Sequence, residues 1–326
     1  MALRPVPWAI GNGAENSVEL ARADSFVGSS GATGIVDPTD FKVVALPTPG
    51  AAVRVRKGTG VIRNTYPGTF GQSYVVQEQS NTDVPVAATG SSGAATKYVY
   101  VLITDSQYGG QAPPSVENGP YNDYAVTTTL PSNQPYLLLA RINQPASTAT
   151  ITNAMITDLR EVANPKEKIV NRSRPLNLTD VETLTQTNPI GERFPNSGGG
   201  QNIDVPSWAT RAIIETEWLM INERPGNAYG AIWVEYGPLN SGGQDRQYST
   251  QRFRWNTQAG SDSARGIWKI SDDVYIPAAL RGTSQVFSMR GYLTYTSGAG
   301  ARPQMDQHSG IVFKVTFLQV ADPSDT

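Results

Sequence analysis

The chain has 326 residues, of which 39% are hydrophobic and 17% charged, with 31 glycines, 23 prolines and no cysteine. This length suits two domains, and low charge with abundant glycine and proline favours short strands joined by turns. The lack of cysteine excludes disulfides and thiolate metal sites. A net charge of -2 without a long basic run argues against nucleic acid as a partner.

Neither a secretory leader nor a membrane span is predicted. Residues 1–10 lack the apolar core of a signal peptide, and no stretch approaches the ~18 apolar residues of a spanning helix. We therefore expect synthesis in the cytoplasm without membrane insertion. Release inside a virion is one route by which such a protein reaches the outside of a cell.

The first half begins with a predicted arm over residues 1–30, followed by a β-domain over residues 31–164. The arm contains one short helix that Asn16 or Ser17 caps and that runs through Phe26. From residue 31 on, apolar and polar residues alternate as in strands. We interpret the arm as a segment that becomes ordered only against a partner.

Two segments of the β-domain stand out. Residues 97–104 are apolar on both faces, which predicts a strand in the middle of a sandwich. Residues 155–162 are predicted to form a second brief helical segment.

Residues 165–200 are predicted as a linker, because Pro165 is followed by mixed charges and, later, by a run of glycines at 198–200. Residues 201–326 form the predicted C-terminal domain, with clean period-two alternation. The residues predicted to share an apolar strand face are Ala212, Ile214, Thr216, Trp218 and Met220, and separately Phe287, Met289, Leu293 and Tyr295. The predicted fold class is all-β, with two antiparallel β-sandwich or jelly-roll-like domains and one or two short helices.

No catalytic, cofactor-binding or metal-binding residue is predicted, although an oxygen-ligand Ca²⁺ site stays open. The single histidine, His308, lies in a polar loop, and no G-x-S-x-G nucleophile motif occurs. Glu215 and Glu217 share one strand face, which is expected to be solvated, whereas the adjacent Asp272 and Asp273 are expected to point to opposite faces of a strand.

Aromatic residues are concentrated in the second half, which contains five of the six tryptophans. Trp218 and Trp255 lie on apolar strand faces and are expected in the core. Trp233 and Trp268 are ambiguous, and tryptophan rings stack on sugars and anchor interfaces. Separately, the polar loop 240–250 suits glycan or protein recognition, although a plain hairpin connection stays open. The candidate contact residues are Trp233, Trp268, Arg246, Tyr248, Arg252 and Arg254.

An ordered set of features over residues 1–165 resembles the minor tail proteins of siphophages that infect actinobacteria. The features that carry this resemblance are Trp8, the helix-like run 17–22, the segment 40–43, and the run 136–142 followed by I-T-D-L-R at 156–160. In the second half, residues 206–212 resemble the entry to the C-terminal sandwich of similar proteins.

The resemblance implies a non-enzymatic structural component of a phage tail tip or baseplate, located in the virion. The N-terminal domain would dock to the tail and the C-terminal domain would face the host or another tail protein. The family carries no catalytic residues to transfer. Virion parts assemble symmetrically, so we expect a homotrimer, which is not held by a coiled coil because no heptads occur.

Two other functions stay open. A receptor-binding protein or carbohydrate-binding module that recognises host cell-surface glycan predicts an exposed aromatic groove. A glycan depolymerase predicts a cleft with two facing carboxylates.

Overall fold

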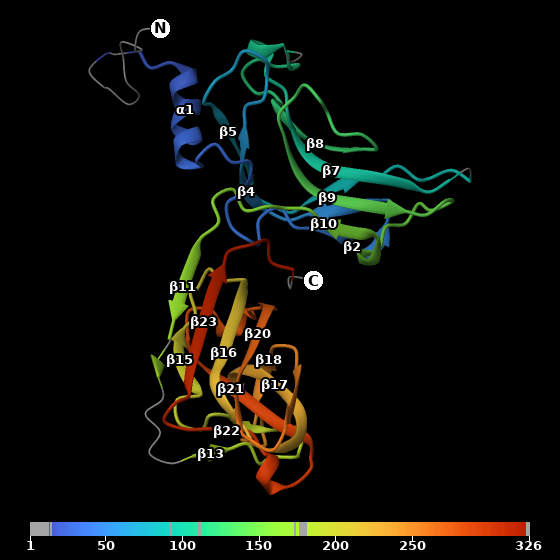
Figure 1. Cartoon of the computed structure of the whole chain (residues 1–326). Helices are drawn as coiled ribbons and strands as arrows, with labels where there is room; N and C mark the ends of the chain where they lie inside the picture. Colours follow the sequence, from blue (N-terminus) through green and yellow to red (C-terminus); the bar gives the residue numbers. More distant parts are fainter. Residues whose placement is uncertain are drawn as a thin grey trace. The chain divides into compact units, whose positions relative to one another are not determined.

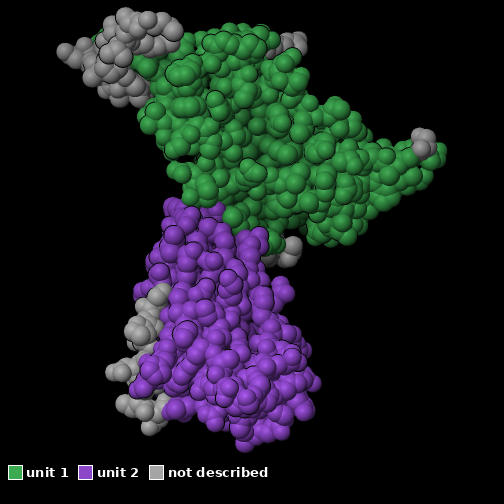
Figure 2. Space-filling view, viewed as in Figure 1, with its two compact units in different colours: residues 1–165, 320–326 green, residues 166–319 purple. Residues whose placement is uncertain are grey.

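The computed structural model describes residues 13, 15–91, 93–109, 112–172, 174–175 and 181–323. Strands dominate and one α-helix is present in these ranges, which confirms the all-β prediction. The chain divides into two compact units, residues 1–165 with 320–326 (unit 1) and residues 166–319 (unit 2), coloured separately in Figure 2. None of the described helices is long and apolar enough to span a membrane.

Unit 1 contains three antiparallel sheets around a shared apolar core. They consist of β1 (Gly34–Ile35), β4 (Gly58–Arg63) and β5 (Ser73–Glu78); β10 (Ile156–Asp158), β9 (Tyr136–Gln144), β7 (Ala95–Ile103) and β8 (Asn122–Thr127); and β2 (Val43–Gly50), β3 (Ala52–Val55) and β6 (Thr82–Pro85). β7 lies between β9 and β8, as its two apolar faces predicted (Figure 1). Short 3₁₀ turns are η1 (Ser106–Tyr108) and η2 (Asn153–Met155).

The predicted helical segment at 155–162 is wrong. Residues 156–158 form β10, which pairs antiparallel with residues 140–142 of β9. An open sheet edge beside this short apolar run offered backbone partners, and tertiary pairing overrides weak local preference.

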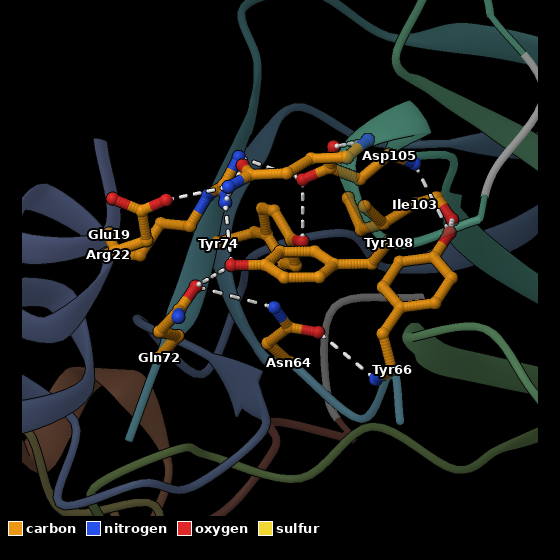
Figure 3. Close-up of polar contacts among 10 residues, drawn as sticks. Glu19, Arg22, Asn64, Tyr66, Gln72, Tyr74, Ile103, Asp105 and Tyr108 are labelled. Carbon is orange, nitrogen blue, oxygen red and sulfur yellow. Dashed lines mark hydrogen bonds and ion pairs between the residues drawn. The ribbon is translucent and has the colours of Figure 1, made fainter. Parts of the chain in front are cut away.

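Helix α1 (Val18–Gly28) begins where the sequence predicted, because the Ser17 hydroxyl accepts a hydrogen bond from the backbone N–H of Leu20 at 3.2 Å. None of its residues is fully buried. Apolar packing therefore cannot hold this helix alone, and a polar network holds it against β5 and η1 (Figure 3).

Arg22 is the centre of this network. Its guanidinium forms an ion pair with Asp105 at 2.8 Å and lies 5.1 Å and 5.5 Å from the ring centroids of Tyr74 and Tyr108. The Tyr74 hydroxyl donates to Asp105 at 2.8 Å, and burial together with this acceptor raises the pKa of Tyr74. Gln107 links the same cluster to Glu19 of the helix at 2.6 Å.

The described part of the predicted arm is thus ordered against its own unit, which corrects the expectation that it orders only against a partner. Residues 1–12 and 14, including Trp8, lie outside the described residues.

Residues 320–323 belong to unit 1, although the predicted C-terminal domain included them. The Lys42 ammonium donates to the Asp322 carbonyl at 3.1 Å, and the Asp322 N–H donates to the Pro38 carbonyl at 3.0 Å. These contacts are made by backbone groups, which leave no pattern of alternating apolar residues in the sequence. The assignment of residues 320–323 to unit 1 could therefore not be predicted.

Unit 2 contains two antiparallel sheets with an apolar core, in a sandwich-like arrangement. The first sheet consists of β11 (Glu167–Asn171), β12 (Arg174–Pro175), β13 (Glu182–Thr183), β16 (Arg211–Glu223), β20 (Ala264–Tyr275), β22 (Gln304–Met305) and β23 (Gly310–Leu318). The second consists of β14 (Glu192–Arg193), β15 (Gly200–Asp204), β17 (Gly226–Leu239), β18 (Arg246–Ser249), β19 (Phe253–Ala259) and β21 (Ser284–Thr296). Two 3₁₀ turns are η3 (Ala278–Leu280) and η4 (Ala299–Ala301).

Residues 165–200 are not a linker, because β11 to β14 extend both sheets of unit 2. β11 pairs with β23 over five residues, from Glu167 opposite Leu318 to Asn171 opposite Lys314. Charged and proline residues suit an edge strand as well as a linker, and composition does not distinguish the two.

Candidate functional site

The outer face of the second sheet of unit 2 carries side chains that alternate with the core residues of β17. Ile232 and Val234 belong to the main core of the unit. Ala231 and Trp233, which point to the other face of β17, form a separate buried cluster with Tyr292. This face therefore has apolar packing of its own.

Two neighbouring strands complete this face. β19 places Arg254 opposite Ala231, and β21 places Tyr292 opposite the same residue on the other side. We call the resulting surface the aromatic–arginine face. Its residues are Tyr229, Trp233, Arg252, Arg254, Tyr292 and Tyr295.

Trp233 lies at one end of the face and is only 2% exposed. The Arg252 guanidinium covers its ring at 4.5 Å from the centroid. The turn at Gly191 approaches it from another side so closely that a Cβ there would collide with the indole. Trp233 is therefore a buried support of the face, and Arg252 packs on its ring.

Tyr229 and Tyr295 form the exposed aromatic part of the face. Their rings stack with centroids 5.4 Å apart at an angle of 21°, and they are 40% and 46% exposed. A β-bulge between Tyr229 and Gly230 aligns the two tyrosines across β17 and β21. An exposed stacked pair offers a flat apolar surface with two hydroxyl groups at its edge.

Arg254 and Tyr292 connect the two ends. Arg254 Nη1 donates to the Tyr292 hydroxyl at 3.2 Å and to Thr294 Oγ1 at 3.3 Å. Burial alone would raise the pKa of Tyr292, but hydrogen bonds with Thr294 and Arg254 and the positive charges of Arg254 and Arg252 lower it below its ordinary value. The face thus combines aromatic surface with guanidinium donors.

Three of the six predicted contact residues, Trp233, Arg252 and Arg254, come together on this face. The other three do not. Trp268 is 7% exposed and stacks on Trp255 in the core with centroids 4.4 Å apart. Its ring cannot contact a partner there, and this corrects the expectation for Trp268.

Arg246 and Tyr248 lie on β18 and serve its packing. Tyr248 packs against the core and stacks on Tyr236, with centroids 5.7 Å apart. Arg246 Nη1 donates to the Gly237 carbonyl at 2.6 Å, and burial lowers the pKa of its guanidinium. Neither side chain joins the aromatic–arginine face.

Sequence reasoning missed Tyr229 and Tyr295. Strict alternation placed Tyr295 with Leu293 on the core face, but the bulge in β21 reverses the direction of every residue beyond it. β16 has a similar irregularity in register between Trp218 and Ile221. It exposes Met220, which strict alternation had placed on the same apolar face as Trp218. A bulge leaves no clear signal in a single sequence.

Three of the four acidic residues considered for catalysis are bound to their neighbours. Glu215 pairs with Lys314 at 2.7 Å, and Asp273 pairs with Arg211 at 2.5 Å. Asp272 accepts from the backbone N–H of Gln251 at 2.7 Å. Within the described ranges, no group of three or more histidine, aspartate or glutamate side chains could hold a metal ion.

No family model matches this sequence, and no curated protein matches it. Solved structures with detectable similarity include the infectious bursal disease virus VP2 subviral particle, at 12% identity over 91% of this chain and 77% of that chain, with a TM-score of 0.26. Another is the CBM22-1–CBM22-2 tandem domain of Xyn10C from Paenibacillus barcinonensis, at 9% identity over 89% of this chain and 98% of that chain, with a TM-score of 0.21. Similarity at these TM-scores carries no argument about function.

The contact between Gly191 and Trp233 gives a direct test of how the face is built. Gly191 has φ +70, and a side chain there would strike the indole. We expect Gly191→Ala to lower the free energy of unfolding by about 3 kcal/mol, from the left-handed backbone and the collision together. Denaturant unfolding of the full chain, followed by tryptophan fluorescence, measures this change.

Gly243→Ala is the matched control, because Gly243 has φ +67 and open space where its Cβ would lie. It should cost only the backbone part, about 1–2 kcal/mol. Equal losses for the two variants would contradict close packing of the 191 turn on Trp233.

Proposed function

We propose that the protein is a non-enzymatic structural component of a phage tail tip or baseplate. Unit 1 docks to the tail, and unit 2 faces the host or a partner protein. The observation that carries the proposal is the ordered set of features in residues 1–165. Two of these features, the segments 40–43 and 156–160, are hydrogen-bonded to each other in the fold. The exposed aromatic–arginine face of unit 2 supports its role as the contacting unit.

Arg160 joins two of the segments on which the resemblance rests. Its guanidinium is fully buried and binds Asp158 through Nε at 2.9 Å and Nη2 at 2.8 Å. Nη1 donates to the carbonyl of Asp40 at 2.6 Å. The I-T-D-L-R segment at 156–160 therefore fastens the 40–43 segment, which explains why both occur in one folded unit.

A second candidate function, recognition of a cell-surface glycan, is favoured by the stacked pair of Tyr229 and Tyr295. Sugar rings stack on flat aromatic surfaces, and guanidinium groups nearby donate to hydroxyl groups. Arg254 lies on the adjacent strand and already donates to a hydroxyl of this face. Tail location and glycan recognition are compatible, whereas depolymerase chemistry would need a pair of facing carboxylates.

The proposed location predicts where the protein lies in a virion. Antibodies raised against the purified chain should label the distal end of the tail when virions of the encoding phage are viewed by electron microscopy. Antibodies against the capsid serve as the control for position. Label confined to the head, or virions free of the protein by mass spectrometry, would exclude a tail component.

The proposed homotrimer predicts a mass in solution near three times 35.0 kDa. Light scattering of the purified full chain at several concentrations measures it. A monomer at every concentration would rule out a trimer that forms before assembly on the tail.

The glycan alternative predicts that Tyr229→Ala and Tyr295→Ala each weaken binding to purified host cell-wall polysaccharide by roughly 30-fold, since a central aromatic contact contributes about 2 kcal/mol. Isothermal titration calorimetry measures the affinity. The control is Tyr121→Ala, which removes an exposed tyrosine of unit 1. Unchanged binding in both test variants would refute glycan recognition by this face.

A further inference from the structure

The outer face of the β2–β3–β6 sheet of unit 1 contains an open cavity of about 570 Å³. Val53 and Val55 of β3 are fully buried in the core, so Arg54 between them points to the opposite face. Val44 of β2 lies opposite Arg54 and lines the same cavity. Its volume falls within the range of small-molecule sites.

Three cationic side chains, Arg54, Arg56 and Lys57, line the cavity. Arg54 binds Asp83 through Nε at 2.7 Å and Nη2 at 2.9 Å, which orients its guanidinium and leaves the Nη1 protons outside this fork. Asp40 is the one carboxylate among the lining residues, and its Oδ2 accepts from the backbone N–H of Asp37 at 2.9 Å. Asp83 and Asp40 offset part of the positive charge, so the lining keeps a modest cationic excess together with many N–H donors.

Two asparagines add neutral donors to the wall. Asn81 Oδ1 accepts from the backbone N–H of Lys57 at 3.2 Å, and Asn153 Oδ1 accepts from that of Ala45 at 2.7 Å. Each amide oxygen is held by a backbone N–H, and the NH₂ group of each side chain is a further donor. Charged and neutral donors thus share one cavity.

We propose that this cavity binds a sugar phosphate. A single carboxylate is satisfied by one guanidinium fork, whereas donors spread over three cationic side chains and two amides suit the several oxygens of a phosphate monoester. The cavity is far larger than one phosphate group. Val44, Ala45 and Pro47 form an apolar part of the lining, where the carbon face of the sugar packs.

Calorimetric titration of the full chain with glucose 6-phosphate, inorganic phosphate, glucuronate and glucose tests the proposal. Glucose 6-phosphate should bind best, inorganic phosphate and glucuronate more weakly, and glucose least. No binding of glucose 6-phosphate at millimolar concentration, or equal binding of glucose, would overturn the proposal. Equal binding of inorganic phosphate would overturn the sugar part of it.

Lys57→Gln should weaken binding of glucose 6-phosphate roughly tenfold, because it removes one charge-assisted hydrogen bond. Lys57 is exposed, so the fold should tolerate the change. Lys269→Gln is the matched control, since Lys269 is an exposed lysine of β20 in unit 2. If the two variants lose equal affinity for glucose 6-phosphate, or if Lys57→Gln loses none, the ligand does not bind in this cavity.

The pH dependence separates phosphate from carboxylate recognition. Phosphate monoesters lose their second proton near pH 6, so binding should tighten several-fold from pH 5 to pH 7.5. The hydrogen bond with Asp83 raises the pKa of Arg54, so its guanidinium stays charged over this range. Asp40, whose pKa burial raises, could only lose a proton as the pH rises, which would weaken anion binding. Affinity for glucose 6-phosphate that does not rise would contradict recognition of the dianion.

Discussion

A one-residue irregularity in β21 determines what unit 2 presents to its surroundings. Side chains of a strand alternate between two faces, so an extra residue turns every later side chain to the other face. Between Tyr229 and Gly230 the register of β17 against β21 shifts in this way, and Tyr295 then lies opposite Tyr229 rather than in the core. The stacked pair, which is the exposed aromatic part of the aromatic–arginine face, depends on this bulge.

Buried and half-buried guanidinium groups hold the segments that apolar packing cannot. α1 has no fully buried residue and depends on Arg22, while Arg160 ties residues 38–40 to β10. In unit 2, Arg290 donates to the carbonyls of Ile190, Gly191 and Gln244 at 3.0–3.1 Å and pairs with Glu235 at 3.4 Å. A planar group with five donors suits irregular backbone, because it can bind several carbonyl oxygens at once.

Period-two alternation predicted the fold class, the central strand at 97–104 and the core positions of Trp218 and Trp255, because burial of one sheet face leaves its mark on every second residue. It could not predict the strands within 165–200, which pair as edges and bury little. Nor could it place Trp268 in the core and Tyr295 outside it. Trp268 lies in a strand that has both apolar and polar residues on each face, and Tyr295 lies beyond a bulge. The alternation of apolar residues along a strand indicates which side chains are buried. The register of the strand depends instead on the strands with which it pairs, and these are distant in the sequence.

The aromatic–arginine face and the cavity beside β3 would bind by different physics. Stacking on Tyr229 and Tyr295 removes apolar surface from water and changes little with salt. Recognition in the cavity rests on Arg54, Arg56 and Lys57 near the surface, where added salt screens the attraction within about 10 Å at 0.1 M. Because each set of residues lies within a single unit, one can be disabled without disturbing the other. A ligand that carries both a sugar ring and a phosphate could use either surface, and its response to salt then distinguishes the one that holds it.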